Sequence, residues 1–198
     1  MRGEHMTINE IMRYTDDVEL LERAENLLRQ IEENGSGESK QALALLLEGL
    51  HNKNLEEEVF ELYKGAAEDG TNPDALLKLA TLYSTGKGCR KDTAKCFACC
   101  YEAVNIGSLD AESYLARLFR DHSMELALYW AEHAANQDHP QGLMDAGSLL
   151  DRLGASRRNG QKYFDAATGY YRKAASLGVS SAKSKTTLLG KLKRVLRW

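Results

Sequence analysis

The sequence predicts an all-α fold, a right-handed α-α superhelical solenoid of about four helix pairs between N- and C-terminal capping helices. Only two prolines, Pro73 and Pro140, interrupt long stretches rich in Ala, Leu, Glu and Lys, which favours helices over strands. Four segments close in the same way at spacings of 37, 31 and 40 residues, which indicates internal repeats. A hydrophobic content of 43% in 198 residues is enough for a core, so we expect one irregular helical-repeat domain over residues 1–198.

The N-terminal cap is expected over residues 1–37. A helical pattern runs from residue 9 to residue 33, with a break near Thr15 and Asp16, where a helix N-cap fits. Met6 is an alternative natural start, so residues 1–5 carry no functional inference.

The repeats are expected over residues 38–178. The four equivalent endings each place Gly or Asp where a helix C-terminus needs a left-handed residue, and they are 66–70, 103–107, 134–138 and 174–178. The helices that follow these endings open with Ala75, Ala111 and Gly142. In each helix an apolar residue lies four positions after the opening residue, and a small residue lies five positions after it. This spacing lets two helices approach closely. Because each helix of a pair buries one face, a single pair is unstable alone and must stack on its neighbours.

The residues from 75 to 107 resemble the Sel1-like repeats, relatives of the tetratricopeptide repeats. The matching positions are Ala75, Leu79-Ala80, Leu82-Tyr83, Gly86-Lys87-Gly88, Asp92, Lys95-Cys96, Ala103-Val104 and Gly107. The resemblance extends in degenerate form over roughly residues 40–182. Two units depart from the pattern: the one from Ala111 lacks the glycine turn, and the one from Gly142 has a longer, basic turn at 154–160.

The charge is polarised along the chain. Residues 1–70 carry 7 basic and 17 acidic side chains, whereas residues 155–198 carry 11 basic and 1 acidic. Such a gradient can steer partners or favour head-to-tail self-contact, and solvated faces of different sign are the simpler interpretation. The oligomeric state is not predicted.

Residues 179–198 predict a basic amphipathic helix. One arc carries Leu188, Leu189, Leu192, Val195 and Leu196, and the other carries Lys191, Lys193, Arg194 and Arg197. The helix either caps the last repeat or contacts an anionic membrane or acidic partner peripherally. No stretch approaches the roughly 18 apolar residues of a transmembrane segment, and no signal peptide is evident, so a cytoplasmic location is expected. Nucleic-acid binding is not expected, since no such fold is indicated.

The sequence shows no catalytic or cofactor motif, and we expect no enzyme, no cofactor and no metal. Cys89, Cys96, Cys99 and Cys100 lie close together, but a helix over 92–106 places Cys96 and Cys100 on one packing stripe. Packed thiols are therefore expected, with zinc or redox chemistry as the alternative. The five histidines form no metal-binding pair, and His122 and His139 fall at turns, where a solvated or capping imidazole is expected.

The resemblance implies a partner-binding surface on the first helices of the pairs, which line the concave face of a solenoid. The predicted contact residues are Lys78, Thr81, Tyr114, Arg117, Arg120, Asp145 and Ser148. Tyr114, Arg117 and Arg120 are favoured, because Tyr and Arg are common anchors of interfaces; an ordinary solvated helix face is the alternative.

The resemblance further implies a non-catalytic interaction module, a bacterial adaptor or regulator that binds a protein of unknown identity. One alternative is an immunity or antitoxin-type protein that neutralises a toxin or effector. A third is a hydrolase acting on cell-wall or β-lactam compounds, as proposed for some cysteine-stapled relatives. Cysteines are absent around Val104 and Ala111, where such relatives carry their disulfides, which argues against it.

Overall fold

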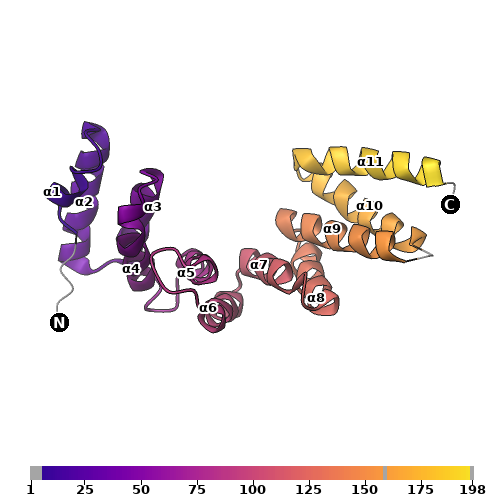
Figure 1. Ribbon diagram of the computed structural model, residues 1–198, viewed down its shortest axis with the longest axis horizontal. Coiled ribbons are helices and arrows are strands. Elements are labelled where there is room, and N and C mark those ends of the chain that lie inside the picture. The colour runs from indigo at the N-terminus through magenta and orange to yellow at the C-terminus, as the bar shows by residue number, and fades with distance from the viewer. Residues whose placement is uncertain (1–5, 158–159, 197–198) are drawn as a thin grey trace. The chain divides into compact units, whose positions relative to one another are not determined.

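The computed structural model describes residues 6–157 and 160–196, with side chains described up to residue 189. Every regular element in this part of the chain is helical, and none is a strand (Figure 1). The predicted all-α repeat fold is confirmed. The chain divides into two compact units, residues 1–107 and 108–198, and each is described by itself. The expectation of a single domain over the whole chain stays a prediction.

Unit 1 contains two helix pairs preceded by two further helices. The first helices are α1 (Ile8–Ile11) and α2 (Val18–Asn34), which are separate because the chain breaks at residues 12–17 as predicted. The first pair is α3 (Gly37–Gly49) and α4 (Glu56–Ala66), joined through the short 3-10 helix η1 (Lys53–Leu55). The second pair is α5 (Pro73–Thr85) and α6 (Thr93–Asn105).

Unit 2 contains two more pairs followed by a final helix. The pairs are α7 (Leu109–Phe119) with α8 (Met124–Asn136), and α9 (Pro140–Ser156) with α10 (Gln161–Ser176). The chain ends in α11 (Ser180–Leu196), which packs on α10. The described chain therefore has the four predicted helix pairs, two in each unit.

The helix ends follow the local rules that the sequence indicates. Among the described residues, a side-chain acceptor satisfies a free backbone N–H at the start of seven α-helices, and these caps are Asp17, Ser36, Asn72, Asp92, Ser108, Ser123 and His139. The four repeat endings close on left-handed residues: Gly70, Gly107, Asp138 and Gly178 have φ of 66°, 88°, 60° and 92°. The predicted left-handed closures are confirmed. Three of these residues are glycines, and Asp138 is the one that carries a side chain.

The small residues predicted to admit close packing do so. Ala80 and Ala116 are buried in the first helices of their pairs. Gly147, the equivalent position in α9, faces the ring of Tyr171, and a Cβ at Gly147 would lie 2.7 Å from that ring. The same pattern occurs in α3, where Ser39, Leu43-Ala44 and Leu47 are buried at the corresponding positions.

The predicted long turn at 154–160 is wrong in its first half. Helix α9 continues through Ser156, and Gly154 lies buried within it. A Cβ at Gly154 would lie 3.0 Å from the ring of Phe164, so this glycine serves close packing of α9 on α10. Residues 158 and 159 lie outside the described part of the chain.

The C-terminal helix is formed, and its described part packs on one side. Ala182 and Leu189 are buried, whereas Leu188 is 58% exposed. The predicted basic arc and most of the apolar arc lie outside the described side chains; these residues are Lys191, Leu192, Lys193, Arg194, Val195, Leu196 and Arg197.

Candidate protein-binding site

Three of the predicted contact residues meet between the first helices of unit 2. Arg117 on α7 donates a hydrogen bond from Nη1 to Asp145 Oδ2 on α9, at 3.1 Å. The same guanidinium lies 5.5 Å from the ring centroid of Tyr114, one turn earlier on α7. The two helices pack against each other, so the pair is held by the fold and not by a flexible loop.

Asp145 fixes Arg117 because its carboxylate is largely withdrawn from solvent. The side chain of Asp145 is 14% exposed, against 40% for Arg117. Burial raises the pKa of the Asp145 carboxyl above its ordinary value, although Arg117 and the Gln141 amide partly offset that rise. The guanidinium is thereby positioned while one side of it stays in solvent.

The two remaining predicted residues of unit 2 lie on the same helices. Ser148 is exposed on α9, one turn after Asp145. Arg120 is half exposed and has a distant ion pair, with its Nε 3.8 Å from Asp121 Oδ2. Asp121 is instead held by Arg152 of α9 at 2.7 Å, and that hydrogen bond lowers the pKa of the Asp121 carboxyl. Arg120 is therefore the least constrained cation of this face.

Lys78 and Thr81 belong to unit 1, where they lie on α5. Lys78 Nζ lies 2.9 Å from Glu48 Oε2 and 5.8 Å from the ring centroid of Tyr63. The Tyr63 hydroxyl donates to the same Glu48 oxygen at 3.0 Å. The pKa of Tyr63 is raised, mainly because the hydroxyl is buried and also because the negative charge of Glu48 is close. Thr81 is half buried, and its hydroxyl donates to the Leu77 carbonyl at 3.0 Å. Lys78, Glu48 and Tyr63 thus form a cluster. Thr81 bonds within its own helix.

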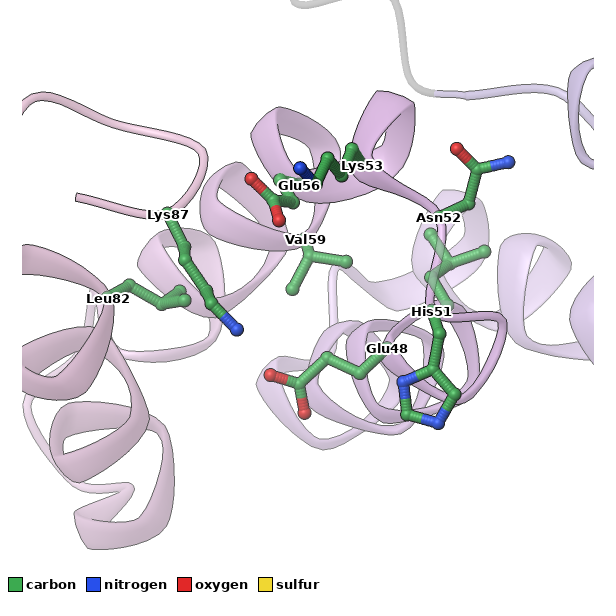
Figure 2. Close-up of a pocket in the computed structure, with 9 residues that line it drawn as sticks. Glu48, His51, Asn52, Lys53, Glu56, Val59, Leu82 and Lys87 are labelled. Carbon is green, nitrogen blue, oxygen red and sulfur yellow. The ribbon is translucent and has the colours of Figure 1, made fainter. Parts of the chain in front are cut away.

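A cavity of about 220 Å³ adjoins this cluster, with Glu48 as a shared residue. Apolar side chains of Leu47, Val59 and Leu82 line it, and Figure 2 shows Lys87 extending toward it from the turn after α5. Its other polar lining residues are His51, Asn52, Lys53 and Glu56. The volume lies below the roughly 300–1,000 Å³ of small-molecule sites, so it suits a side chain of a partner better than a cofactor.

A serine, a histidine and an aspartate also meet in unit 2. Ser113 Oγ lies 3.2 Å from His139 Nδ1, and His139 Nε2 lies 3.2 Å from Asp110 Oδ1. The backbone N–H of Gly142 donates to the same Nδ1 at 3.2 Å, so His139 caps α9 as predicted. Ser113 has no exposed surface, which leaves its hydroxyl without access to a substrate. The group stabilises the α7–α9 packing.

Glu112 is a buried carboxylate that the sequence analysis missed. It is 4% exposed, and its Oε2 lies 2.8 Å from Nδ1 of His133 on α8. The repeat register indicates that position 112 is buried, because the equivalent residues Leu76 and Leu143 also follow the opening small residue of their helices and are buried.

The cysteines are packed on α6 and the turn before it. Cys96, Cys99 and Cys100 are buried, and Cys89 is partly exposed. Burial raises the pKa of the Cys99 thiol to about 11. The pKa of the Cys100 thiol is also raised, because it donates a hydrogen bond to Cys96 and is buried. Among the described residues, no group of three or more His, Cys, Asp or Glu side chains is arranged to hold a metal ion.

The helix pairs define an α-helical repeat fold, and solved Sel1-repeat proteins share this fold. A Sel1 repeat protein from Oxalobacter formigenes superposes with a TM-score of 0.68 at 20% identity, over 96% of this chain and 77% of that one. A protective antigen of uropathogenic Escherichia coli strains, which displays an SLR fold, gives a TM-score of 0.68 at 20% identity over 89% of this chain and 37% of that one. The chain therefore has the Sel1-repeat fold, as its resemblance to these repeats predicts.

One curated relative is similar in sequence. Chitin synthase regulatory factor 3 of Schizosaccharomyces pombe is 26% identical over 138 residues, which cover 64% of this chain. The chain spans only 14% of the length of that relative. No protein-family model matches the chain. In the part of the chain that the structure describes, no helix has the length and apolar character needed to cross a membrane.

Proposed function

We propose that the chain is a non-catalytic protein-protein interaction module, a bacterial cytoplasmic adaptor or regulator. It binds a segment of a partner protein on the α7–α9 face, defined by Tyr114, Arg117, Arg120, Asp145 and Ser148. The observation that carries this proposal is the positioned Arg117, held by buried Asp145 and placed beside the Tyr114 ring. Two of the solved proteins with this fold come from bacteria, which supports the setting. The sequence relative from Schizosaccharomyces pombe is a regulatory factor, which supports the role.

The α7–α9 face supports binding because its anchors are ordered before a partner arrives. Tyr and Arg supply much of the affinity of interfaces, and ordering them in advance reduces the entropy lost on binding. Arg117 keeps donors toward solvent beyond the bond to Asp145, and Arg120 adds a second guanidinium one turn later. An extended or helical segment with carboxylate groups would satisfy both.

The proposal is tested by affinity purification at native expression followed by mass spectrometry. The double variant Tyr114→Ala/Arg117→Ala should lower recovery of the bound protein by about tenfold or more, since anchors of this kind each contribute more than about 1 kcal/mol. The matched control is Tyr129→Ala/Arg172→Ala, which removes the same residue types from exposed positions on the second helices α8 and α10. It should leave recovery unchanged.

Arg117→Ala also leaves the Asp145 carboxylate without its cation, so thermal unfolding is measured in parallel. The single variant Arg120→Ala separates binding from stability, because its own ion pair spans 3.8 Å. Equal recovery of every co-purifying protein with wild type, Y114A/R117A and R120A would refute the assignment of this face.

A further inference from the structure

A basic cleft of about 570 Å³ lies in unit 1, apart from the residues proposed above to bind a partner. It lies where the turn between α5 and α6 passes the side of α4. Its cationic lining residues are Lys64, Arg90, Lys91 and Lys95, its aromatic residues are Phe60 and Tyr83, and Asp92, Cys89 and Thr93 complete it. We call it the basic cleft.

The basic cleft lies in a unit whose net charge is negative. Unit 1 carries 20 acidic and 12 basic side chains, yet Arg90, Lys91 and Lys95 fall within six residues of one another. The carboxylate of Asp92 accepts the backbone N–H of Lys95 at 3.0 Å, so it is engaged in capping α6. Within the described residues, no ion pair of Arg90 or Lys91 is found, whereas Lys64 pairs with Glu61 at 2.8 Å. Within the described residues Arg90 and Lys91 thus form no ion pair, and the Lys95 ammonium lies over the Tyr83 ring.

The turn that carries these cations is fixed in place. Gly86 and Gly88 adopt left-handed φ of 77° and 66°. The Asp92 N–H donates to the Tyr83 carbonyl at 3.0 Å, which ties the end of the turn to α5. Gly88 packs against the Glu56 carbonyl so closely that a Cβ would lie 1.9 Å from that oxygen. Arg90 and Lys91 are thus presented by an ordered backbone, which lowers the entropic cost of binding.

The aromatic side chains form a wall and not a stacking platform. Phe60 and Tyr83 are 7% and 9% exposed and pack edge to face at 5.3 Å. Lys64 Nζ lies 5.9 Å from the Phe60 ring and Lys95 Nζ lies 5.3 Å from the Tyr83 ring. Because ammonium groups already lie over these rings, a nucleobase finds no free ring face, which disfavours single-stranded nucleic acid.

We propose that the basic cleft binds a phosphate group carried on a side chain of a partner protein. A phosphate dianion offers three strong acceptor oxygens, and the several guanidinium and ammonium donors that line this one cleft match them better than they match a single carboxylate. The protein carrier rests on the proposed function, whereas the phosphate chemistry rests on the cleft alone.

The test is an NMR titration of the full-length protein with a neutral Gly/Ser-rich peptide bearing one phosphoserine. Backbone amide shifts should be saturable and centred on residues 89–95, and the unphosphorylated peptide should produce none. Arg90→Glu/Lys91→Glu should weaken binding by about tenfold or more, since charge-assisted hydrogen bonds are lost and repulsion is added. Arg13→Glu/Arg23→Glu makes the same change in net charge on exposed sites of unit 1 and should alter affinity less than about twofold.

Four results would overturn the proposal: no saturable shift with the phosphopeptide, equal binding of a peptide with glutamate in place of phosphoserine, tighter binding of a short RNA, or an equal loss in R13E/R23E. Inorganic phosphate that binds as tightly as the phosphopeptide would overturn the peptide carrier. The Y114A/R117A variant is titrated in parallel. Retained phosphopeptide binding there separates the cleft from the α7–α9 face, so either proposal can fail alone.

Discussion

At the scale of single residues, the repeat register predicts which side of a helix a residue occupies but not its partner. Asp151 is equivalent to Arg120 by this register, because each lies nine positions after the residue that opens its helix. In the structure Asp151 Oδ2 accepts a hydrogen bond from the Tyr171 hydroxyl at 2.8 Å. Arg117 and Asp145 were both predicted as partner contacts, yet they bond to each other. Such pairs join residues 20 and 28 positions apart, so no local pattern reveals them.

Asp151 gives a pH-dependent prediction because its carboxylate is poorly solvated. Burial raises the pKa of Asp151 above its ordinary value of 3.8, and Oδ1 is buried without a hydrogen-bond partner among the described residues. The native state thus binds more protons than the unfolded state between these two pKa values. The contribution of Asp151 to stability is present below pH 3.8 and is lost as the pH rises through the folded pKa.

Asparagine at position 151 cannot titrate. The free energy of unfolding of Asp151→Asn, relative to that of wild type, should therefore be higher at pH 7 than at pH 3. Urea unfolding across this range measures the difference in free energy of unfolding. The control is Asp16→Asn, which makes the same substitution at an exposed position of unit 1. A difference between D151N and wild type that stays constant with pH would contradict the burial argument.

At the scale of helices, boundaries were predictable wherever a local residue sets them. Asn72 and Asp92 cap α5 and α6, and Asp138 takes the left-handed position that glycine takes in the other repeats. The end of α9 was predicted wrongly because Gly154 resembles a turn residue, whereas the Phe164 ring of another helix fills the space beside it. The role of a glycine inside a helix therefore depends on the neighbouring helix, which sequence spacing alone does not supply.

Two helical glycines of unit 2 should respond oppositely to alanine. A Cβ at Gly142 would lie 2.6 Å from the Ala134 Cβ and 2.8 Å from the Ala135 nitrogen, so Gly142→Ala should lower the free energy of unfolding by about 1–3 kcal/mol. At Gly169, in the middle of α10, nothing lies within 4 Å, and Gly169→Ala should raise it by about 0.5–1 kcal/mol. Urea unfolding of both variants checks the pair. A neutral Gly142→Ala would show that α8 and α9 can separate without cost.

At the scale of the whole molecule, the number of helix pairs was predictable because the same helix ending occurs four times along the sequence. Charge follows the units: unit 1 has 20 acidic and 12 basic side chains, and unit 2 has 9 acidic and 14 basic. The sequence did not indicate a division at residue 107, since the 103–107 ending resembles the other three. Division into compact units depends on how contacts are distributed over the whole chain.

Each unit holds two complete helix pairs, so each should fold without the other. In a repeat protein each pair is stabilised by its internal contacts and its nearest neighbour. In unit 2 one buried cluster runs from Ala116 in α7 to Leu189 in α11, and in unit 1 α3 packs on both α2 and α4. Fragments 1–107 and 108–198 should give helical circular dichroism and cooperative urea transitions, each with a smaller denaturant slope than the full chain, because each exposes less surface on unfolding. A fragment 1–91, which removes α6 from the α5/α6 pair, is the control and should lose cooperativity. If 1–107 or 108–198 gave the spectrum of an unfolded chain, the stability of that unit would depend on the remainder of the protein.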